Sequence, residues 1–235
     1  MLPKVLVGCP VSDHGMYSVD KYLAGIKALT YPHFDLLLVD NSKEDIFFKN
    51  VKERGIPIER ISYSETARDR LVRSRNVLVE RILQGKYDYL LSLEFDVIPP
   101  PDVIQRLLAH RKKVISGVYF KPVEYTYGGK VVKKEIAPVA FKSIGNSKWV
   151  SRMTYDEVKD DKLVEIRTVG LGCMLISRAI FEEGVRFRYE EGKEVFDDTF
   201  FCYDVRNIVR EKVFMDTSVK CVHLVKDKSW ENIKK

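Results

Sequence analysis

Short apolar runs alternate with amphipathic segments through the first half of the chain. Continuous apolar runs bounded by turn residues are typical of buried strands, whereas apolar residues spaced three and four apart are typical of helices. This pattern predicts strands at 4–11, 34–40, 56–62, 87–93 and 113–120, and helices at 19–29, 66–83 and 102–108. Alternating strands and helices favour a largely parallel sheet covered by helices, so we expect an α/β fold.

The second half of the chain has a different pattern. Residues 121–168 are rich in Lys, Tyr and Gly and predict hairpins or loops. An apolar run follows at 169–177, then helices at 178–183 and 197–210 and a last strand at 218–224. The chain shows no internal repeat and no linker, which predicts one domain over 1–225 and a Lys-rich tail at 226–235.

Composition and charge exclude several classes of protein. The 235 residues are 45% hydrophobic and 31% charged, which excludes collagen-like, low-complexity and disulfide-rich mini-proteins. The 40 Lys and Arg outnumber the 34 Asp and Glu, and the formal charge is +6. Such an excess suits a polyanionic partner, namely nucleic acid, anionic lipid or a phosphorylated small molecule, or else a solvated lysine-rich surface.

The cysteine spacing and the hydropathy of the chain indicate the cellular compartment of the protein. The four cysteines, at positions 9, 173, 202 and 221, form no CxxC pair, which predicts free thiols in a reducing compartment. The longest apolar runs are far shorter than the roughly 18–20 residues that span a bilayer, and the N-terminal run is too short for a signal peptide. We therefore expect a cytoplasmic protein, with peripheral contact at a membrane left open.

Two carboxylates follow a predicted buried strand. Glu94 and Asp96 come directly after the strand at 87–93, at the sheet edge where α/β proteins bind ligands. Oxygen ligands suit Mg²⁺ or Mn²⁺, so the pair predicts either a metal site or an exposed acidic turn. His223, inside the run CVHL, is either a core histidine bonded to a carbonyl or a further metal ligand.

Other polar and glycine residues are candidates for the same site. Asp197 and Asp198 open the helix DDTFFCYDVRN, where acidic residues stabilise the N-terminus or supply a general base. Asp40 ends a strand and is either a helix N-cap or an acceptor for a base or ribose. Gly170 and Gly172 indicate close approach of a backbone or a ligand. The chain has no GxGxxG, GxxxxGK[ST] or GxSxG motif, which disfavours a Rossmann dinucleotide site, a P-loop and a nucleophile elbow.

In their order along the chain, these segments resemble those of GT-A fold glycosyltransferases, closest to the family 2-like group. The matching segments, over 4–224, are VGCPV, VDNS, SRNVLVERIL, YDYLLSLEFDVIPPPDVIQRLL, SGVYF, VGLGCMLISRAIFE, DDTFFCYDVR and VKCVHL. The chain departs from the family at Glu94, where Asp is usual in the DxD motif, and it lacks the QxxRW motif, which argues against processive polysaccharide synthesis. The resemblance implies one GT-A domain with a mixed, mainly parallel central sheet flanked by helices. Its nucleotide-sugar-binding half would be 1–120 and its acceptor-side half 121–225.

The resemblance also implies a reaction. A sugar would pass from a nucleotide-diphosphate sugar to an acceptor hydroxyl, on a glycan, a lipid-linked molecule or a small molecule, with Mn²⁺ or Mg²⁺ held by Asp96 and His223. Asp198, beside Asp197, would be the catalytic base if the enzyme inverts configuration, and would have another role if it retains configuration. The nucleotide sugar would contact Pro10, Val11, Asp40, Arg75, Glu94 and Asp96, and the acceptor would contact Gly170 and Gly172.

Two alternatives stay open. A nucleotidyltransferase uses a related sheet, but it normally carries a basic glycine-rich loop after the first strand, where this chain has CPVSDHGMY. The other alternative is a non-catalytic nucleic-acid- or sugar-binding domain, because the basic and aromatic stretch 119–134 partly fits nucleic acid. The expected site is acidic, so the basic excess lies elsewhere, chiefly at 121–134 and in the tail.

Overall fold

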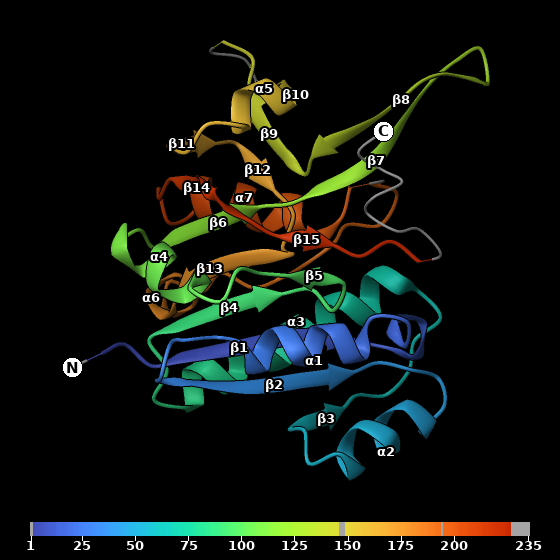
Figure 1. Cartoon of the computed structure of the whole chain (residues 1–235), viewed down its shortest axis with the longest axis vertical. Helices are drawn as coiled ribbons and strands as arrows, with labels where there is room; N and C mark the ends of the chain where they lie inside the picture. The colour runs from blue at the N-terminus through green and yellow to red at the C-terminus, as the bar shows by residue number, and fades with distance from the viewer. Residues whose placement is uncertain (1, 146–148, 194, 227–235) are drawn as a thin grey trace.

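A mixed sheet forms the centre of the computed structural model, which describes residues 2–145, 149–193 and 195–226 (Figure 1). Among these residues the sheet has eight strands, in the spatial order β11 (Leu163–Ile166), β14 (Val213–Lys220), β6 (Val114–Val118), β13 (Cys173–Ser177), β4 (Tyr89–Leu93), β1 (Val5–Val11), β2 (Phe34–Asp40) and β3 (Ile58–Arg60). The four strands from β4 to β3 are parallel, β13 is antiparallel to β4 and β6, β14 is parallel to β6, and β11 is antiparallel to β14. The prediction of a mixed, mainly parallel sheet is confirmed.

Helices cover both faces of this sheet. One face carries α1 (Val19–Lys27), α2 (Ile46–Glu53) and α4 (Val103–Ala109), and the other carries α3 (Ala67–Gln84), α6 (Arg178–Glu182) and α7 (Asp197–Asn207). Because successive side chains of a strand point to opposite faces, Val7 of β1 joins one core with Tyr22, whereas Leu6 joins the other core with Leu78. The α/β prediction is thus realised as three layers around two cores.

The packing of α3 on β1 is especially close. Apolar residues of the helix predicted at 66–83 are buried, with Leu78, Val79 and Ile82 against the sheet. A Cβ on Gly8 would lie 2.7 Å from Leu78 Cδ1, so glycine at this position lets the helix approach the strand. This contact fixes α3 closely against the middle of β1.

Smaller elements extend the second half of the chain. A three-stranded sheet contains β9 (Ala140–Ser143), β10 (Val150–Arg152) and β12 (Thr168–Val169), with α5 (Tyr155–Val158) beside it. β7 (Phe120–Tyr127) and β8 (Lys130–Pro138) form a hairpin that projects from the body (Figure 1). β5 (Val97–Ile98) pairs with β15 (Val222–His223), and a short 3₁₀ helix, η1 (Asp13–Gly15), follows β1. The prediction of hairpins or loops over 121–168 is confirmed for the β7–β8 hairpin, whereas α5 forms in that stretch although no helix is predicted there.

Three local predictions differ from the structure. No helix is predicted between 40 and 56, yet α2 forms there because Phe47 and Val51, one turn apart, bury one face against the sheet. The last strand, predicted at 218–224, is β14, which begins at Val213. Its register with β6 shifts between Asp216 and Lys220, so His223 lies on the separate strand β15. The apolar run 169–177 is divided, because the chain turns at 170–172 between β12 and β13.

Other features of the sequence can be placed in the fold. All four cysteines are free and buried, as predicted. None of the helices formed by the described residues is long and apolar enough to cross a membrane. Of the predicted tail at 226–235, only Lys226 is described, and the rest of the tail lies outside the described residues.

Candidate functional site

Two adjoining hollows open at the carboxyl ends of the central strands. The first hollow, of about 350 Å³, is lined by residues that include Pro10, Val11, Asn41, Arg70 and Asp96. The second hollow, of about 460 Å³, is lined by residues that include Tyr119, Lys121, Asp198 and His223. Leu71, Arg75 and Glu94 line both hollows and so form the wall between them. This edge of an α/β sheet is where ligands bind.

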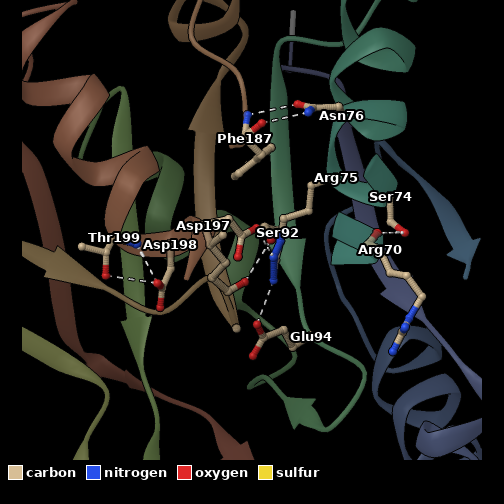
Figure 2. A network of polar contacts seen from close by, with 12 residues as sticks. Arg70, Ser74, Arg75, Asn76, Ser92, Glu94, Phe187, Asp197, Asp198 and Thr199 are labelled. Atoms are coloured by element: carbon tan, nitrogen blue, oxygen red, sulfur yellow. Dashed lines mark hydrogen bonds and ion pairs between the residues drawn. The ribbon is translucent and has the colours of Figure 1, made fainter. Parts of the chain in front are cut away.

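Arg75 links the elements that build this wall. Its buried guanidinium donates from Nη1 to Asp197 Oδ2 at 3.0 Å and from Nη2 to Glu94 Oε1 at 2.9 Å (Figure 2). Burial alone would lower the pKa of Arg75, but the charges of Asp197 and Glu94 outweigh burial and raise it, so the group stays charged. Arg75 therefore ties α3 to the end of β4 and to the start of α7, with both NH₂ groups committed to carboxylates of this chain.

Glu94 and Asp96 have different partners. Glu94 is paired with Arg75 and keeps 35% of its side chain exposed. Burial and the neighbouring charge of Asp96 raise the pKa of Glu94 above its usual range, and the ion pair with Arg75 offsets only part of that shift. The two carboxylates of the DxD-like segment thus have different partners, since Glu94 pairs with Arg75 and Asp96 faces His223.

Asp197 and Asp198 lie in the first turn of α7, as predicted. Asp197 is buried against Arg75. Asp198 lines the second hollow, and its Oδ1 accepts hydrogen bonds from the backbone N–H of Thr199 at 2.6 Å and from the Thr199 hydroxyl at 3.2 Å. Burial and the adjacent Asp197 charge raise the pKa of Asp198 above its usual range. A carboxylate with a raised pKa is a better proton acceptor than an ordinary aspartate.

Asp96 and His223 meet at the boundary of the two hollows. His223 Nε2 lies 3.3 Å from Asp96 Oδ2, and His223 Nδ1 lies 3.0 Å from the carbonyl oxygen of Phe120. A carbonyl can only accept, so Nδ1 carries the hydrogen. Tyr17 donates its hydroxyl to the same Asp96 oxygen at 3.3 Å, and burial together with Asp96 raises the pKa of Tyr17 to about 12.

The Asp96–His223 pair suits a divalent cation. Once Nε2 gives up its proton, an imidazole whose Nδ1–H is held by a carbonyl presents its Nε2 lone pair, which is the usual arrangement of a metal-binding histidine. Carboxylate and imidazole are ligands that Mn²⁺ accepts. The described part of the chain brings together no cluster of three His, Cys, Asp or Glu side chains suited to a metal. The pair would therefore supply two ligands, and the remaining ligands would come from outside the chain, such as water.

Asp40 shapes the loop after β2. Its side chain is fully buried, and its Oδ1 accepts hydrogen bonds from the backbone N–H of Ser42 at 3.1 Å and from the Ser42 hydroxyl at 2.5 Å. Burial raises the pKa of Asp40, and these bonds offset part of the shift. Asn41, the next residue, lines the first hollow instead. The contact with a base or ribose that the sequence suggested for Asp40 would therefore be made by Asn41.

Gly170 and Gly172 set the position of Tyr119. A Cβ on Gly172 would lie 2.6 Å from Tyr119 Cζ, and a Cβ on Gly170 would also collide with the ring hydroxyl. The backbone N–H of Gly172 donates to Tyr119 Oη at 3.3 Å. Since Tyr119 lines the second hollow, the two glycines influence that hollow through the tyrosine.

Some residues of the hollows are absent from the sequence-based prediction. Asn41 follows the predicted residue Asp40, so the end of the strand at 34–40 was the signal that could have indicated it. Arg70 and Tyr17 carry no such signal, because only the packing of α3, and of the turn between η1 and α1, on the sheet brings them to the first hollow. Tyr119 lies inside the quoted segment SGVYF, yet a buried strand end is an equally good explanation of that tyrosine.

No protein-family model and no curated protein matches the chain. Solved structures do. The crystal structure of GalNAc-T7 with UDP, GalNAc and Mn²⁺ aligns with a TM-score of 0.69 at 13% identity, over 97% of this chain and 45% of that chain. The crystal structure of A197 from STIV aligns with a TM-score of 0.51 at 14% identity, over 95% of this chain and 86% of that chain. This chain thus spans less than half of the GalNAc-T7 chain. The structural similarity confirms the fold prediction: the chain has the GT-A glycosyltransferase fold.

Proposed function

We propose that the chain is a metal-dependent glycosyltransferase that moves a sugar from a nucleotide-diphosphate sugar to an acceptor hydroxyl. The observation that best supports this function is the arrangement of the candidate metal ligands and the candidate base across the two hollows. Asp96 and His223 meet at the boundary, and Asp198 lies in the second hollow. The GalNAc-T7 structure, which contains UDP, GalNAc and Mn²⁺, is consistent with such ligands on this fold.

The first hollow would bind the nucleoside of the donor. Pro10 and Val11 form part of its wall at the end of β1, and Asn41 offers a side-chain amide held by a hydrogen bond to Ser74 Oγ at 3.0 Å. Arg70 adds a positive charge to the same hollow, which favours an anionic ligand. These residues belong to 1–120, the half of the domain that we assign to the nucleotide sugar.

Asp96 and His223 would hold Mn²⁺ or Mg²⁺. When bound, the cation neutralises the negative charge that develops on the leaving nucleoside diphosphate. The chain positions both ligands in advance, because Tyr17 donates to Asp96 and the Phe120 carbonyl accepts from His223. The Arg75–Glu94 pair stands beside Asp96 and keeps the wall between the hollows in place.

The second hollow would bind the acceptor. In an inverting reaction, the acceptor oxygen attacks the sugar carbon as the bond from that carbon to the diphosphate breaks, and Asp198 takes the hydroxyl proton. Thr199 holds Asp198 by its backbone N–H and its hydroxyl, while Asp197 stays paired with Arg75. The residues at 121–225 would thus select the acceptor.

Thermal unfolding with nucleoside diphosphates tests this proposal. A ligand at 100 times its Kd stabilises the folded state by about 2.7 kcal/mol. That corresponds to a rise in Tm of about 5–10 °C for a domain of this size. We expect such a rise with Mn²⁺ and at least one diphosphate together, and a much smaller rise for Asp96→Ala. The matched control is Asp20→Ala, whose side chain is 83% exposed on α1 and which should respond like the wild type. No rise with any diphosphate contradicts the donor site.

A further inference from the structure

The β7–β8 hairpin has a firm base and an exposed tip. Its strands pair from Phe120–Pro138 to Tyr127–Lys130, and Gly128 and Gly129 close a two-residue turn with φ of 56° and 75°. Positive φ at both turn residues is typical of a tight hairpin turn. At the base, Arg152 Nη1 donates to the Pro138 carbonyl at 3.0 Å, and the Phe120 carbonyl is bonded to His223.

The tip exposes apolar and aromatic side chains. Tyr127 is 82% exposed, Val132 63% and Val131 45%. A two-stranded ribbon is marginal in water by itself, and clustered exposed apolar side chains mark interaction sites. Figure 1 shows the hairpin and the β9–β10 region at the same end of the long axis. Trp149, which precedes β10, is 77% exposed. Tyr and Trp are the residues enriched where proteins enter the bilayer interface.

The charge of the hairpin is positive and consists of lysines. Residues 120–138 contain four Lys, two Glu and no Arg. Lys133 and Lys134 are paired with glutamates, whereas Lys121 and Lys130 have no acidic partner among the described residues. Lysine beside exposed valine suits a lipid surface, because its stem lies along apolar groups while its ammonium reaches anionic headgroups. Nucleic-acid surfaces depend more on arginine, which binds phosphate with two hydrogen bonds.

We propose that the tip of this hairpin docks the protein on a bilayer that contains anionic lipid. Tyr127, Val131 and Val132 enter the interfacial layer, and Lys130 contacts the headgroups. The hairpin base borders the second hollow, where Lys121 and Val139 form part of the lining. The hairpin would therefore run from the docked membrane to the second hollow, and a lipid-linked acceptor could reach the hollow along it, a consequence that rests on the proposed function.

Cosedimentation with lipid vesicles tests the docking without any donor or acceptor. We expect the full chain to bind vesicles of mixed phosphatidylcholine and phosphatidylglycerol, to bind phosphatidylcholine vesicles far less, and to be released by salt. The double variant Val131→Ser, Val132→Ser should bind about tenfold more weakly, because two apolar side chains no longer enter the interface. Lys130→Glu should bind at least about fivefold more weakly.

Two matched variants control for nonspecific effects. Ile46→Ser removes an apolar side chain that is 68% exposed at the start of α2, at the other end of the molecule, and Lys21→Glu reverses an exposed lysine on α1. Both should bind vesicles like the wild type, and all variants should keep the wild-type Tm.

Three results would overturn the proposal. They are no binding of the wild type to the mixed vesicles, equal losses in hairpin and control variants, and hairpin-dependent binding of mixed-sequence RNA without vesicle binding. Failure of nucleoside diphosphates to raise the Tm would contradict the proposed function and leave the vesicle result unaffected.

Discussion

Replacing Arg75 with methionine removes the positive charge that Asp197 and Glu94 share. Methionine keeps a similar length and fills the same space between α3 and β4. Asp197 has 5% of its side chain exposed, so it would be left as a buried carboxylate without its partner. Glu94 is 35% exposed and can recover part of its hydration. The two carboxylates therefore lose very different amounts of stabilisation.

The expected loss of stability follows from this difference. Breaking a buried ion pair by removing one partner costs about 3–5 kcal/mol. The partly exposed pair with Glu94 contributes less than about 1 kcal/mol. The Arg75 Nε–H is buried without a partner among the described residues, so its removal stabilises the folded state by about 1 kcal/mol. We expect the free energy of unfolding to fall by about 3–4 kcal/mol, which lowers the Tm by about 10 °C for a domain of this size.

Urea denaturation followed by circular dichroism measures this loss. Arg75→Lys keeps a charge but cannot form both pairs, so its stability should lie between the wild type and Arg75→Met. The matched control is Arg54→Met, which breaks the exposed pair with Asp20 at 2.8 Å and should cost less than about 1 kcal/mol. An Arg75→Met protein within about 1 kcal/mol of the wild type would show that Arg75 does not hold the wall of the site together.

Three further predictions concern the second hollow. Asp198→Asn should lower kcat for release of nucleoside diphosphate from the preferred donor by at least about 100-fold without lowering the Tm, and an unchanged kcat contradicts the role of general base. Burial and Asp197 raise the pKa of Asp198, so kcat/KM should fall as the pH drops through a value above the usual aspartate pKa of about 4. A fall in kcat/KM that occurs only at or below about pH 4 contradicts the role of Asp198 as the base. Gly172→Ala should lower the free energy of unfolding by about 1–3 kcal/mol in urea, because the new Cβ would lie 2.6 Å from Tyr119 Cζ, and wild-type stability contradicts that close contact.

The sequence predicts the strands that carry the site because their hydrophobic patterns are strong. The runs at 34–40 and 87–93 are largely apolar, and polar residues lie at or just after their ends, at the edge where β2 and β4 end. The position of Asp197 and Asp198 at a helix start is also predictable, since acidic residues favour that place. α2 is harder to predict, because only Phe47 and Val51 of its eight residues are buried.

The partners of the site residues are not predictable from local pattern. Arg75 and Asp197 are 122 positions apart, and their ion pair exists because α3 and α7 pack on the same face of the sheet. Glu94 and Asp96 look like one pair in the sequence, yet Glu94 faces Arg75 and Asp96 faces His223. The register shift after Asp216 moves His223 out of the central sheet, and that shift depends on pairing with β6.

A crystal structure of the chain with UDP and Mn²⁺ tests the central claim most directly. We expect Mn²⁺ to bind between Asp96 and His223 and to contact the diphosphate, with the nucleoside in the first hollow beside Asn41. Mn²⁺ bound away from Asp96 and His223, or the nucleotide bound outside the first hollow, would contradict it.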